Sequence, residues 1–370
     1  MKLQRLYKTS AKGATQIIDM EILGDTYTRT WGQLDGKMQS KATTAKGKNI
    51  GKANKTSPEA QAILEAEAVW TKKQKANYSM SPDAPVSVKL PMKVNNYHDH
   101  KKKVIFPCFV SVKLNGVNAE YRLEDNKLQL LSRGGEQYPI PEHQALEARK
   151  LLTHLGTTSI NGEMYIHGKY LQDIMAATKK HNEDTPLLKF FVFDFPEAEG
   201  DYNSRCAAMY SKYNEMANEA PNVPLVQAGI ANSHEELDDL HEQAVDAGYE
   251  GIIIRNPKGL YEYNKRSLDV FKYKKAQDAE FEVVGFNIDK NGHVVYECDA
   301  GEGLPFAVKC KGTAEERLAD AAVASSNIGK YLKVEFEMWS KPRLHYTRGL
   351  PQKPVGIMFR KVDANGEAIE

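Results

Sequence analysis

Cysteine, long apolar runs and net charge are all scarce in this 370-residue chain. Its four cysteines are scattered and form no Cys-x-x-Cys pair, which argues against a zinc knuckle or a disulfide framework and favours a reducing compartment. No apolar run approaches the roughly 20 residues that a membrane helix needs. The first ten residues are polar and lack the apolar core of a signal peptide. These absences predict a cytoplasmic protein with no membrane partner.

The net charge of +1 hides an uneven distribution. Residues 1–80 contain 14 lysines and arginines against 7 aspartates and glutamates, whereas the remainder carries 36 basic and 42 acidic residues. A basic N-terminal module on a mildly acidic body indicates a contact with a polyanion at one end of the protein. A solvated lysine-rich loop is the alternative, and charge alone does not exclude it.

Hydrophobic patterning divides the chain into segments and predicts a multidomain α+β protein. Residues 1–78 indicate a small α+β unit, and residues 79–86, with two prolines, indicate a linker. Residues 87–278 alternate short apolar strands with helices, which predicts a mixed α/β domain rather than a doubly wound one. Residues 279–370 indicate several short strands with one helix, which suits a small β-barrel of the OB type.

Turn and capping signals locate individual elements within these segments. We expect strands over residues 15–22, 27–31, 109–112, 119–123, 128–131, 190–195, 251–255, 280–286 and 330–338. A loop rich in lysine and glycine is expected over residues 37–56. We expect helices beginning at Ser57-Pro58, running from Ser233 to Gly248, and spanning residues 313–324.

One lysine stands out as a candidate nucleophile. Lys113 ends the apolar segment Phe109–Val112 and precedes a turn that contains Gly116, so its amine would be held at a strand end where backbone can approach a ligand. An amine attacks phosphorus only when it is deprotonated, so its pKa must fall from about 10.4 toward neutrality. The alternative is a surface lysine before a β-turn, which the short motif alone does not exclude.

Further charged and aromatic residues follow Lys113 at the ends of other expected strands. They are Arg133 after Ser132, Glu163 after Gly162, Phe193, Glu250 before Gly251, Arg255, Lys272 and Lys274. Each has an ordinary explanation as part of a turn, a core strand or a solvated face. It is their order along the chain that makes the set informative.

In this order the residues resemble the six-motif signature of the covalent nucleotidyltransferases, the superfamily of DNA ligases, RNA ligases and mRNA capping enzymes. The resemblance spans roughly residues 88–363 and is most similar to phage-like ATP-dependent DNA ligases. It implies an ATP-grasp-like nucleotidyltransferase domain followed by an OB-fold barrel. The last motif, a basic residue in the closing barrel strand, falls on Arg360.

The resemblance also implies residue roles. Lys113 would attack the α-phosphate of ATP, Lys272 and Lys274 would neutralise the growing charge, and Arg360 would orient the leaving pyrophosphate. Nucleotide-binding positions fall on Lys113, Glu163 at the ribose, Phe193 at the adenine, Glu250, Arg255, Lys272 and Lys274. Arg133 would hold the 5′-phosphate of a DNA nick. Glu250, with Glu163, would hold Mg²⁺ or Mn²⁺, as hard cations prefer oxygen ligands.

Two positions depart from the family pattern. Asn115 stands where many members have aspartate, and Asn118 stands where many ligases have arginine. The second departure removes an expected ribose or phosphate contact. Lys103, Arg122 or another cation could replace it.

The N-terminal segment resembles a WGR domain over about residues 4–78. The similarity rests on Trp31-Gly32, with Gln33 in place of the arginine, and on the later helix that carries Trp70. It implies a contact with nucleic acid by Trp31 and by the loop lysines Lys46, Lys48 and Lys52. Burial of Trp31 in the core of a small domain is the alternative.

These features are compatible with three functions. An ATP-dependent DNA ligase, working as a monomer on nicked double-stranded DNA, fits best because residues 280–286 and 349–355 resemble the ligase barrel. An RNA ligase or a capping guanylyltransferase would use the same chemistry. A catalytically inactive nucleic-acid-binding scaffold is disfavoured by the intact charged residues. The compact layout suggests a viral enzyme acting in the host cytoplasm or at the nucleoid.

Overall fold

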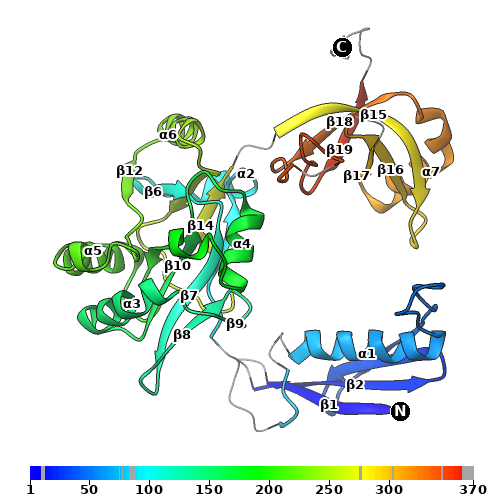
Figure 1. The fold of residues 1–370 in the computed structure, drawn as a ribbon, viewed down its shortest axis with the longest axis horizontal. Coiled ribbons are helices and arrows are strands. Elements are labelled where there is room, and N and C mark those ends of the chain that lie inside the picture. The colour runs from blue at the N-terminus through cyan, green and yellow to red at the C-terminus, as the bar shows by residue number, and fades with distance from the viewer. Residues whose placement is uncertain are drawn as a thin grey trace.

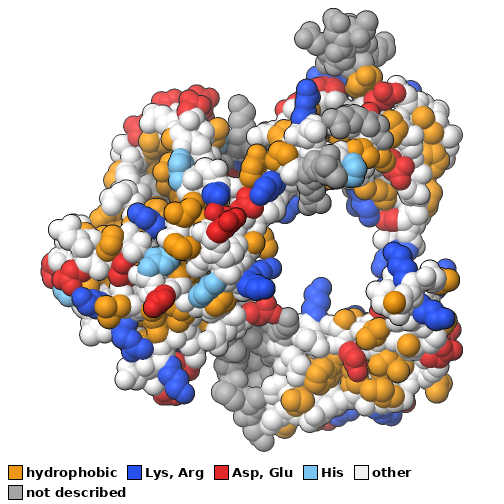
Figure 2. All heavy atoms as spheres, in the orientation of Figure 1, with side chains coloured by type: hydrophobic (Ala, Val, Ile, Leu, Met, Phe, Trp, Pro, Cys, Tyr) orange, Lys and Arg blue, Asp and Glu red, His pale blue; other side chains and the backbone are white. Residues whose placement is uncertain are grey.

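The computed structural model describes residues 1–9, 13–74, 76, 78–82, 89–274, 277–301, 304–342 and 345–360. These residues form three units in chain order, each with its own buried core (Figure 1). In the space-filling view the three units surround an opening (Figure 2). The domain boundaries inferred above stay predictions.

The N-terminal unit is an antiparallel sheet covered by one helix. The described residues form strands in the order β1-β2-β3-β4. Their bounds, with that of the helix, are β1 Lys2–Thr9, β2 Thr15–Leu23, β3 Thr26–Gln33, β4 Met38–Thr44 and α1 Pro58–Gln74. Ile18 and Met20 of β2 are buried together with Ala62 and Ala66 of α1. Small residues on the helix let it lie close to the sheet, which buries this core.

One prediction for this unit is corrected. The first part of the expected loop 37–56 is strand β4, whose side chains are almost all exposed, so no alternation of polar and apolar residues marked it as a strand. At the start of the expected linker 79–86, Ser79 exchanges backbone hydrogen bonds with Tyr7 of β1 at 2.7 and 2.8 Å, and the bounds of the linker stay a prediction. Residues 83–86 lie outside the described residues.

The middle unit contains two sheets. Its described strands are ordered β11-β10-β7-β8-β9 in one sheet and β12-β6-β13-β14-β5 in the other. The strands are β5 Lys93–Asn96, β6 Cys108–Lys113, β7 Val117–Glu124, β8 Lys127–Ser132, β9 Gln137–Tyr138, β10 Ser159–Tyr165, β11 Lys189–Asp194, β12 Ala228–Ala231, β13 Gly251–Arg255 and β14 Arg266–Tyr273. Its helices are α2 Tyr97–His100, α3 Glu142–Leu155, α4 Leu171–Lys179, α5 Tyr202–Asn214 and α6 His234–Asp246, with 3-10 turns at Lys101–Lys103, Thr185–Leu187 and Ala217–Glu219. Every pairing in these sheets is antiparallel except β14 with β5, which excludes a doubly wound fold.

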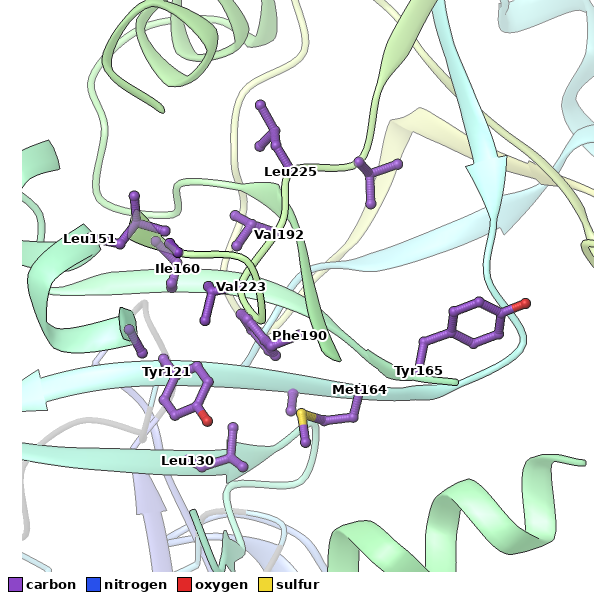
Figure 3. Close-up of a cluster of buried hydrophobic side chains, with 14 of the residues drawn as sticks. Tyr121, Leu130, Leu151, Ile160, Met164, Tyr165, Phe190, Val192, Val223 and Leu225 are labelled. Carbon is purple, nitrogen blue, oxygen red and sulfur yellow. The ribbon is translucent and has the colours of Figure 1, made fainter. Parts of the chain in front are cut away.

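The largest hydrophobic core is packed against the sheet β11-β10-β7-β8-β9 (Figure 3). Tyr121 of β7 and Phe190 of β11 meet edge to face, with ring centroids 4.8 Å apart, beside Ile160 of β10. Leu151 of α3 packs against the same cluster. Because these side chains are fully buried, they fix β7, β10 and β11 relative to one another, and with them the residues at the strand ends.

The C-terminal unit is a closed barrel, ordered β15-β16-β17-β19-β18 in the described residues. Its elements are β15 Gln277–Ile288, β16 Val294–Asp299, β17 Pro305–Cys310, α7 Ala314–Val323, a 3-10 turn at Ala324–Asn327, β18 Tyr331–Phe336 and β19 Val355–Arg360. The prediction of short strands with one helix is confirmed. The assignment of the barrel to the OB type stays a prediction.

Two helix starts follow the predicted caps, at Ser57 and Ser233. Ser57 accepts a hydrogen bond from the backbone N–H of Ala60 at 3.2 Å, and Ser233 accepts one from Glu236 at 3.2 Å. Thr313 and Glu316 form a complete capping box at the start of α7. Within the described part of the chain, no helix is both long and apolar enough to cross a bilayer.

Candidate active site

A cavity of about 500 Å³ lies between the two sheets of the middle unit and is bordered by the barrel. Sheet residues from both sides face it, and the barrel contributes the segments 337–338 and 352–353. The cavity lining includes most of the residues singled out in the sequence: Lys113, Arg133, Glu163, Phe193, Glu250, Arg255, Lys272 and Lys274. Residues that are far apart in the sequence therefore meet at one site.

Strand pairing places Lys113 beside Glu250. In the register of β6 with β13, Lys113 lies opposite Gly251, and the backbone N–H of Glu250 donates to the carbonyl of Lys113 at 3.0 Å. The Lys113 ammonium donates to the Glu250 carboxylate, and both side chains are mostly buried. The candidate nucleophile is thus held by an acid from the neighbouring strand.

The motif glycines allow backbone to approach closely here. A Cβ on Gly116 would lie 2.3 Å from the carbonyl oxygen of Met164, and a Cβ on Gly251 would lie 2.2 Å from that of Tyr273. Gly251 also has a φ of +142°, which side chains rarely allow. Both positions demand glycine for packing reasons, independent of any chemistry.

Charges alternate across the cavity from the middle unit to the barrel. Lys274 Nζ lies 3.2 Å from Glu250 Oε1 and 2.7 Å from Glu337 Oε1, and Glu337 Oε2 lies 2.8 Å from Lys353 Nζ. With Lys113 at the far end, the order is lysine, glutamate, lysine, glutamate, lysine. Anionic phosphates could replace these carboxylates as partners of the lysines.

Glu163 and Lys272 carry shifted pKa values. Burial raises the pKa of Glu163 to about 7, against the opposing effect of nearby Lys113 and Arg133. Burial also lowers the pKa of Lys272, and the charge of Lys274 lowers it further. Both shifts reflect the cost of burying a charged group. Each reduces the free-energy difference between the charged and the neutral form of the side chain near pH 7.

Phe193 is supported by a buried ion network. Arg255 lies with its guanidinium 5.4 Å from the Phe193 ring centre and donates to Asp194 at 2.9 Å. Arg205 donates to the same carboxylate at 3.0 Å. Asp194 is 1% exposed, so one buried acid holds two buried arginines. Arg255 therefore acts as a support beneath the aromatic ring as well as a residue of the cavity wall.

Arg133 stands in a turn built by its neighbour. Ser132 Oγ accepts hydrogen bonds from the backbone N–H groups of Gly134 at 3.2 Å and Glu136 at 2.9 Å. Arg133 itself is exposed and reaches the cavity rim. An exposed arginine at a rim is suited to a ligand that enters from solvent.

Arg360 is not brought to the cavity within the described part of the chain. Its Nε lies 3.7 Å from Glu280 Oε1 of β15, and this Nε has no hydrogen-bond partner among the described residues. The barrel instead turns Glu337 and Lys353 toward the middle unit. The role of Arg360 at pyrophosphate stays a prediction, and this arrangement of the barrel does not serve it.

The proposed DNA-binding residues of the N-terminal unit differ among themselves. Lys46, Lys48 and Lys52 are all exposed, and Lys48 also pairs with Glu65 at 2.9 Å. Trp31 is half-buried against the core, and the Arg29 guanidinium lies 4.3 Å from its ring centre. Trp70 donates its indole N–H to the carbonyl of Gln4 at 2.7 Å, which identifies it as a structural residue.

Sequence reasoning missed several cavity residues. Glu337 and Lys353 carry no local motif and reach the cavity only because of how the barrel packs. Arg266, at the start of β14, is exposed on the cavity wall and supplies a cation in a region where Asn118 replaces the expected arginine. Of the substitutes considered, Arg122 is engaged by Glu120 at 2.8 Å and, like Lys103, is absent from the described cavity lining.

The described part of the chain shows no preformed metal site. The described residues contain no group of three or more histidine, cysteine, aspartate or glutamate side chains that could hold a metal. Two of the carboxylates that line the cavity, Glu163 and Glu250, offer the oxygen donors that Mg²⁺ accepts. A magnesium ion that arrives with a nucleotide fits this donor set, with phosphate and water completing its shell.

A two-sheet α/β unit with a strand-end lysine in a charged cavity, followed by a closed barrel, defines a nucleotidyltransferase-type fold. Residues 89–274, about half of the chain, match the family described as ATP dependent DNA ligase domain. The chain therefore belongs to the ATP-dependent DNA ligase family, and DNA ligation is its enzymatic activity. This family decides against the RNA ligase and capping alternatives and against an inactive scaffold.

Individual relatives agree with this assignment. The chain is 24% identical over 347 residues to the DNA ligase of Enterobacteria phage T4, covering 76% of this chain and 70% of that protein. It is 26% identical over 342 residues to a DNA ligase of African swine fever virus, covering 85% and 78%. A structure from a study of Lig E DNA ligases superimposes with a TM-score of 0.57 at 21% identity, covering 74% of this chain and 100% of that chain. At that identity the superposition shows a shared fold.

Proposed function

We propose that Lys113 carries AMP from ATP to the 5′-phosphate of a nick in duplex DNA. The amine nitrogen forms a bond to the α-phosphorus, the bond to pyrophosphate breaks, and the amine loses a proton. The 5′-phosphate oxygen then attacks this phosphorus and releases the amine. Attack by the 3′-hydroxyl on the 5′-phosphorus finally joins the strands and releases AMP. The observation that carries the proposal is the meeting of Lys113 and Glu250 in a cavity that also holds Lys272 and Lys274.

Each of the remaining residues would bind a different part of the nucleotide or of the nick. Phe193, backed by Arg255, would stack on adenine, and Glu163 would accept hydrogen bonds from the ribose. Lys272 and Lys274 would neutralise charge at the α-phosphate, because phosphoryl transfer depends on positioning and on cationic stabilisation. Arg133, exposed at the rim, would hold the 5′-phosphate of the nick.

Magnesium would be held by Glu250 and Glu163 together with phosphate oxygens. When bound, the ion supplies positive charge that offsets the charge of the phosphates. The protein contributes the two carboxylates and keeps Lys274 beside Glu250, at 3.2 Å. Glu250 would therefore place both Lys274 and the metal near the same phosphate.

Asn118 would take over a ribose contact despite lacking the charge of the usual arginine. Its Oδ1 is buried at the cavity wall and has no hydrogen-bond partner among the described residues. A buried acceptor without a partner is costly, so a ribose hydroxyl that donates to it would be stabilised. Arg266 would supply the missing positive charge.

The N-terminal unit would hold the DNA backbone as a WGR-like domain, beside a barrel of the OB type. Arg29, Lys41 and Lys290 line a depression between this unit and the tip of the β15–β16 hairpin, and its described lining includes no acidic residue. Lysine and arginine side chains also stand on the rim of the opening between the units (Figure 2). Facing cations without acidic partners favour a phosphate backbone between them.

Trp31, Lys46, Lys48 and Lys52 would extend this contact. The enzyme would act as a monomer on nicked duplex, in the host cytoplasm if it is viral.

A label-transfer assay tests the chemistry directly. Protein mixed with α-labelled ATP and Mg²⁺ should become covalently labelled, whereas Lys113→Ala should not. Label retained by Lys113→Ala would locate the nucleophile elsewhere. GTP and NAD⁺ should label poorly, and strong labelling by GTP would contradict the assignment to ATP.

A further inference from the structure

The barrel places a carboxylate where the phosphates of a nucleotide would bind. Glu337 follows β18, lines the cavity, and bridges Lys274 at 2.7 Å and Lys353 at 2.8 Å. Its backbone N–H donates to the carbonyl of Gln352 at 3.0 Å, which holds the segments before β19 and after β18 side by side. The barrel therefore presents Glu337 and Lys353 to the middle unit as one piece.

Glu337 is negatively charged at neutral pH. Burial acts to raise its pKa, but hydrogen bonds from Lys274 and Lys353 outweigh this and lower it. Lys274 is consequently shared by two carboxylates, Glu250 at 3.2 Å and Glu337 at 2.7 Å. An ammonium group has three N–H donors, so two carboxylates leave little room for a phosphate.

We propose that Glu337 competes with the triphosphate of ATP for Lys274. When no pyrophosphate group is present, Glu337 docks the barrel on the cavity; when ATP binds, its triphosphate displaces Glu337. This rests on the proposed function of Lys274 at the α-phosphate. The triphosphate of ATP brings several negative charges to the position of Glu337 and competes for the same lysine. The single phosphate of lysyl–AMP, after pyrophosphate has left, brings far less charge and is compatible with the docked carboxylate.

The position of Arg360 supports this assignment. The barrel residue expected at pyrophosphate is paired with Glu280 instead of lining the cavity, so the barrel face seen here is not one that assists ATP. The docked barrel thus suits the steps after pyrophosphate release, and Glu337 couples its docking to the charge of the bound nucleotide.

The test separates the first step from the last. Glu337→Gln should lower the KM for ATP in self-adenylylation by about fivefold to tenfold with little change in kcat, because it removes the competing charge. The same variant should seal a pre-adenylylated nick about tenfold more slowly, since the barrel loses its anchor on Lys274. Glu337→Asp keeps the charge and should restore values toward wild type in both assays.

A matched control uses another ion pair between barrel and middle unit. Lys341 donates to Asp173 of α4 at 2.9 Å, and neither residue lines the cavity. Asp173→Asn should leave the KM for ATP within twofold of wild type. An equal fall in KM for Asp173→Asn would show that any weakening of docking favours ATP, which would overturn the assignment to Glu337.

Other outcomes are also decisive. A folded Glu337→Gln enzyme, judged by its melting temperature, whose KM for ATP is unchanged or raised would contradict the proposal. Failure of the wild-type enzyme to label with ATP would contradict the proposed function itself. The two failures are distinguishable because the first is measured on an enzyme that forms lysyl–AMP.

Discussion

The backbone of Glu250 is hydrogen-bonded to the backbone of Lys113, and their side chains form an ion pair in the same place. Because the backbones are joined, rotation of either side chain still leaves the two residues adjacent. We expect Glu250→Ala to reduce nick sealing by roughly 10²–10³, as does the loss of one positioned electrostatic group in other enzymes. Lys274→Ala should lose a similar factor, because Lys274 shares the Glu250 carboxylate at 3.2 Å.

Steady-state sealing of a nicked duplex measures both effects. Glu219→Ala serves as control, since Glu219 pairs with Lys150 at the surface of the same unit. Near-normal sealing by folded Glu250→Ala would leave this acid with a structural role only.

Glu163 should make stability depend on pH. Its pKa is raised from 4.5 to about 7 by burial, so the folded state retains a proton that the unfolded state loses. The stabilising contribution is complete below pH 4.5 and is lost as the pH rises through 7. Glu163→Gln removes this dependence, so its free energy of unfolding relative to wild type should improve by roughly 1–3 kcal/mol between pH 5 and 8.

Urea unfolding of both proteins at several pH values measures this difference. A difference that stays constant from pH 5 to 8 would mean that Glu163 titrates normally.

Asp194 should be a stability hot spot. Asp194→Ala leaves Arg205 and Arg255 buried without their shared partner, which costs about 3–5 kcal/mol of unfolding free energy. The KM for ATP should also rise, because Arg255 supports the Phe193 ring. Asp278→Ala, which breaks an ion pair with Lys333 on the barrel surface, should cost below about 1 kcal/mol. Equal losses in the two variants would refute the argument from burial.

The lysines near residue 50 should differ in their contribution to DNA binding. Lys46 and Lys52 are exposed, so replacing either by alanine should flatten the slope of log K against log salt by roughly 0.9 for each phosphate that the lysine neutralises. Lys48→Ala is the matched comparison, because Lys48 is paired with Glu65 and should contribute less. Titration of nicked DNA at several salt concentrations gives the slopes. An unchanged slope for Lys46→Ala/Lys52→Ala would exclude these lysines from binding the DNA backbone.

The strand-end motifs at Lys113, Glu163 and Glu250 were predictable because each combines a glycine with a charged residue next to an apolar run. The expected strand 251–255 is observed with the same bounds, and 109–112 extends by one residue at each end. Strand β4 was missed because its side chains are exposed on both faces, which removes the alternation that marks a strand. Glu337 was missed for another reason: its relation to Lys274 depends on packing between units, about which local sequence carries no signal.

The division of the cavity between two sheets has a mechanical consequence. Lys113, Glu250 and Lys272 stand on β6, at the start of β13 and on β14 of one sheet, whereas Glu163 and Phe193 stand on β10 and β11 of the other. Under the proposed roles, the reactive groups share one sheet and would stay in register if the sheets shifted. The contacts to base and sugar would instead change with the distance between the sheets. A bound nucleotide would therefore contact both sheets at once. We expect its binding to reduce the motion of one sheet relative to the other without moving Lys113 within its own sheet.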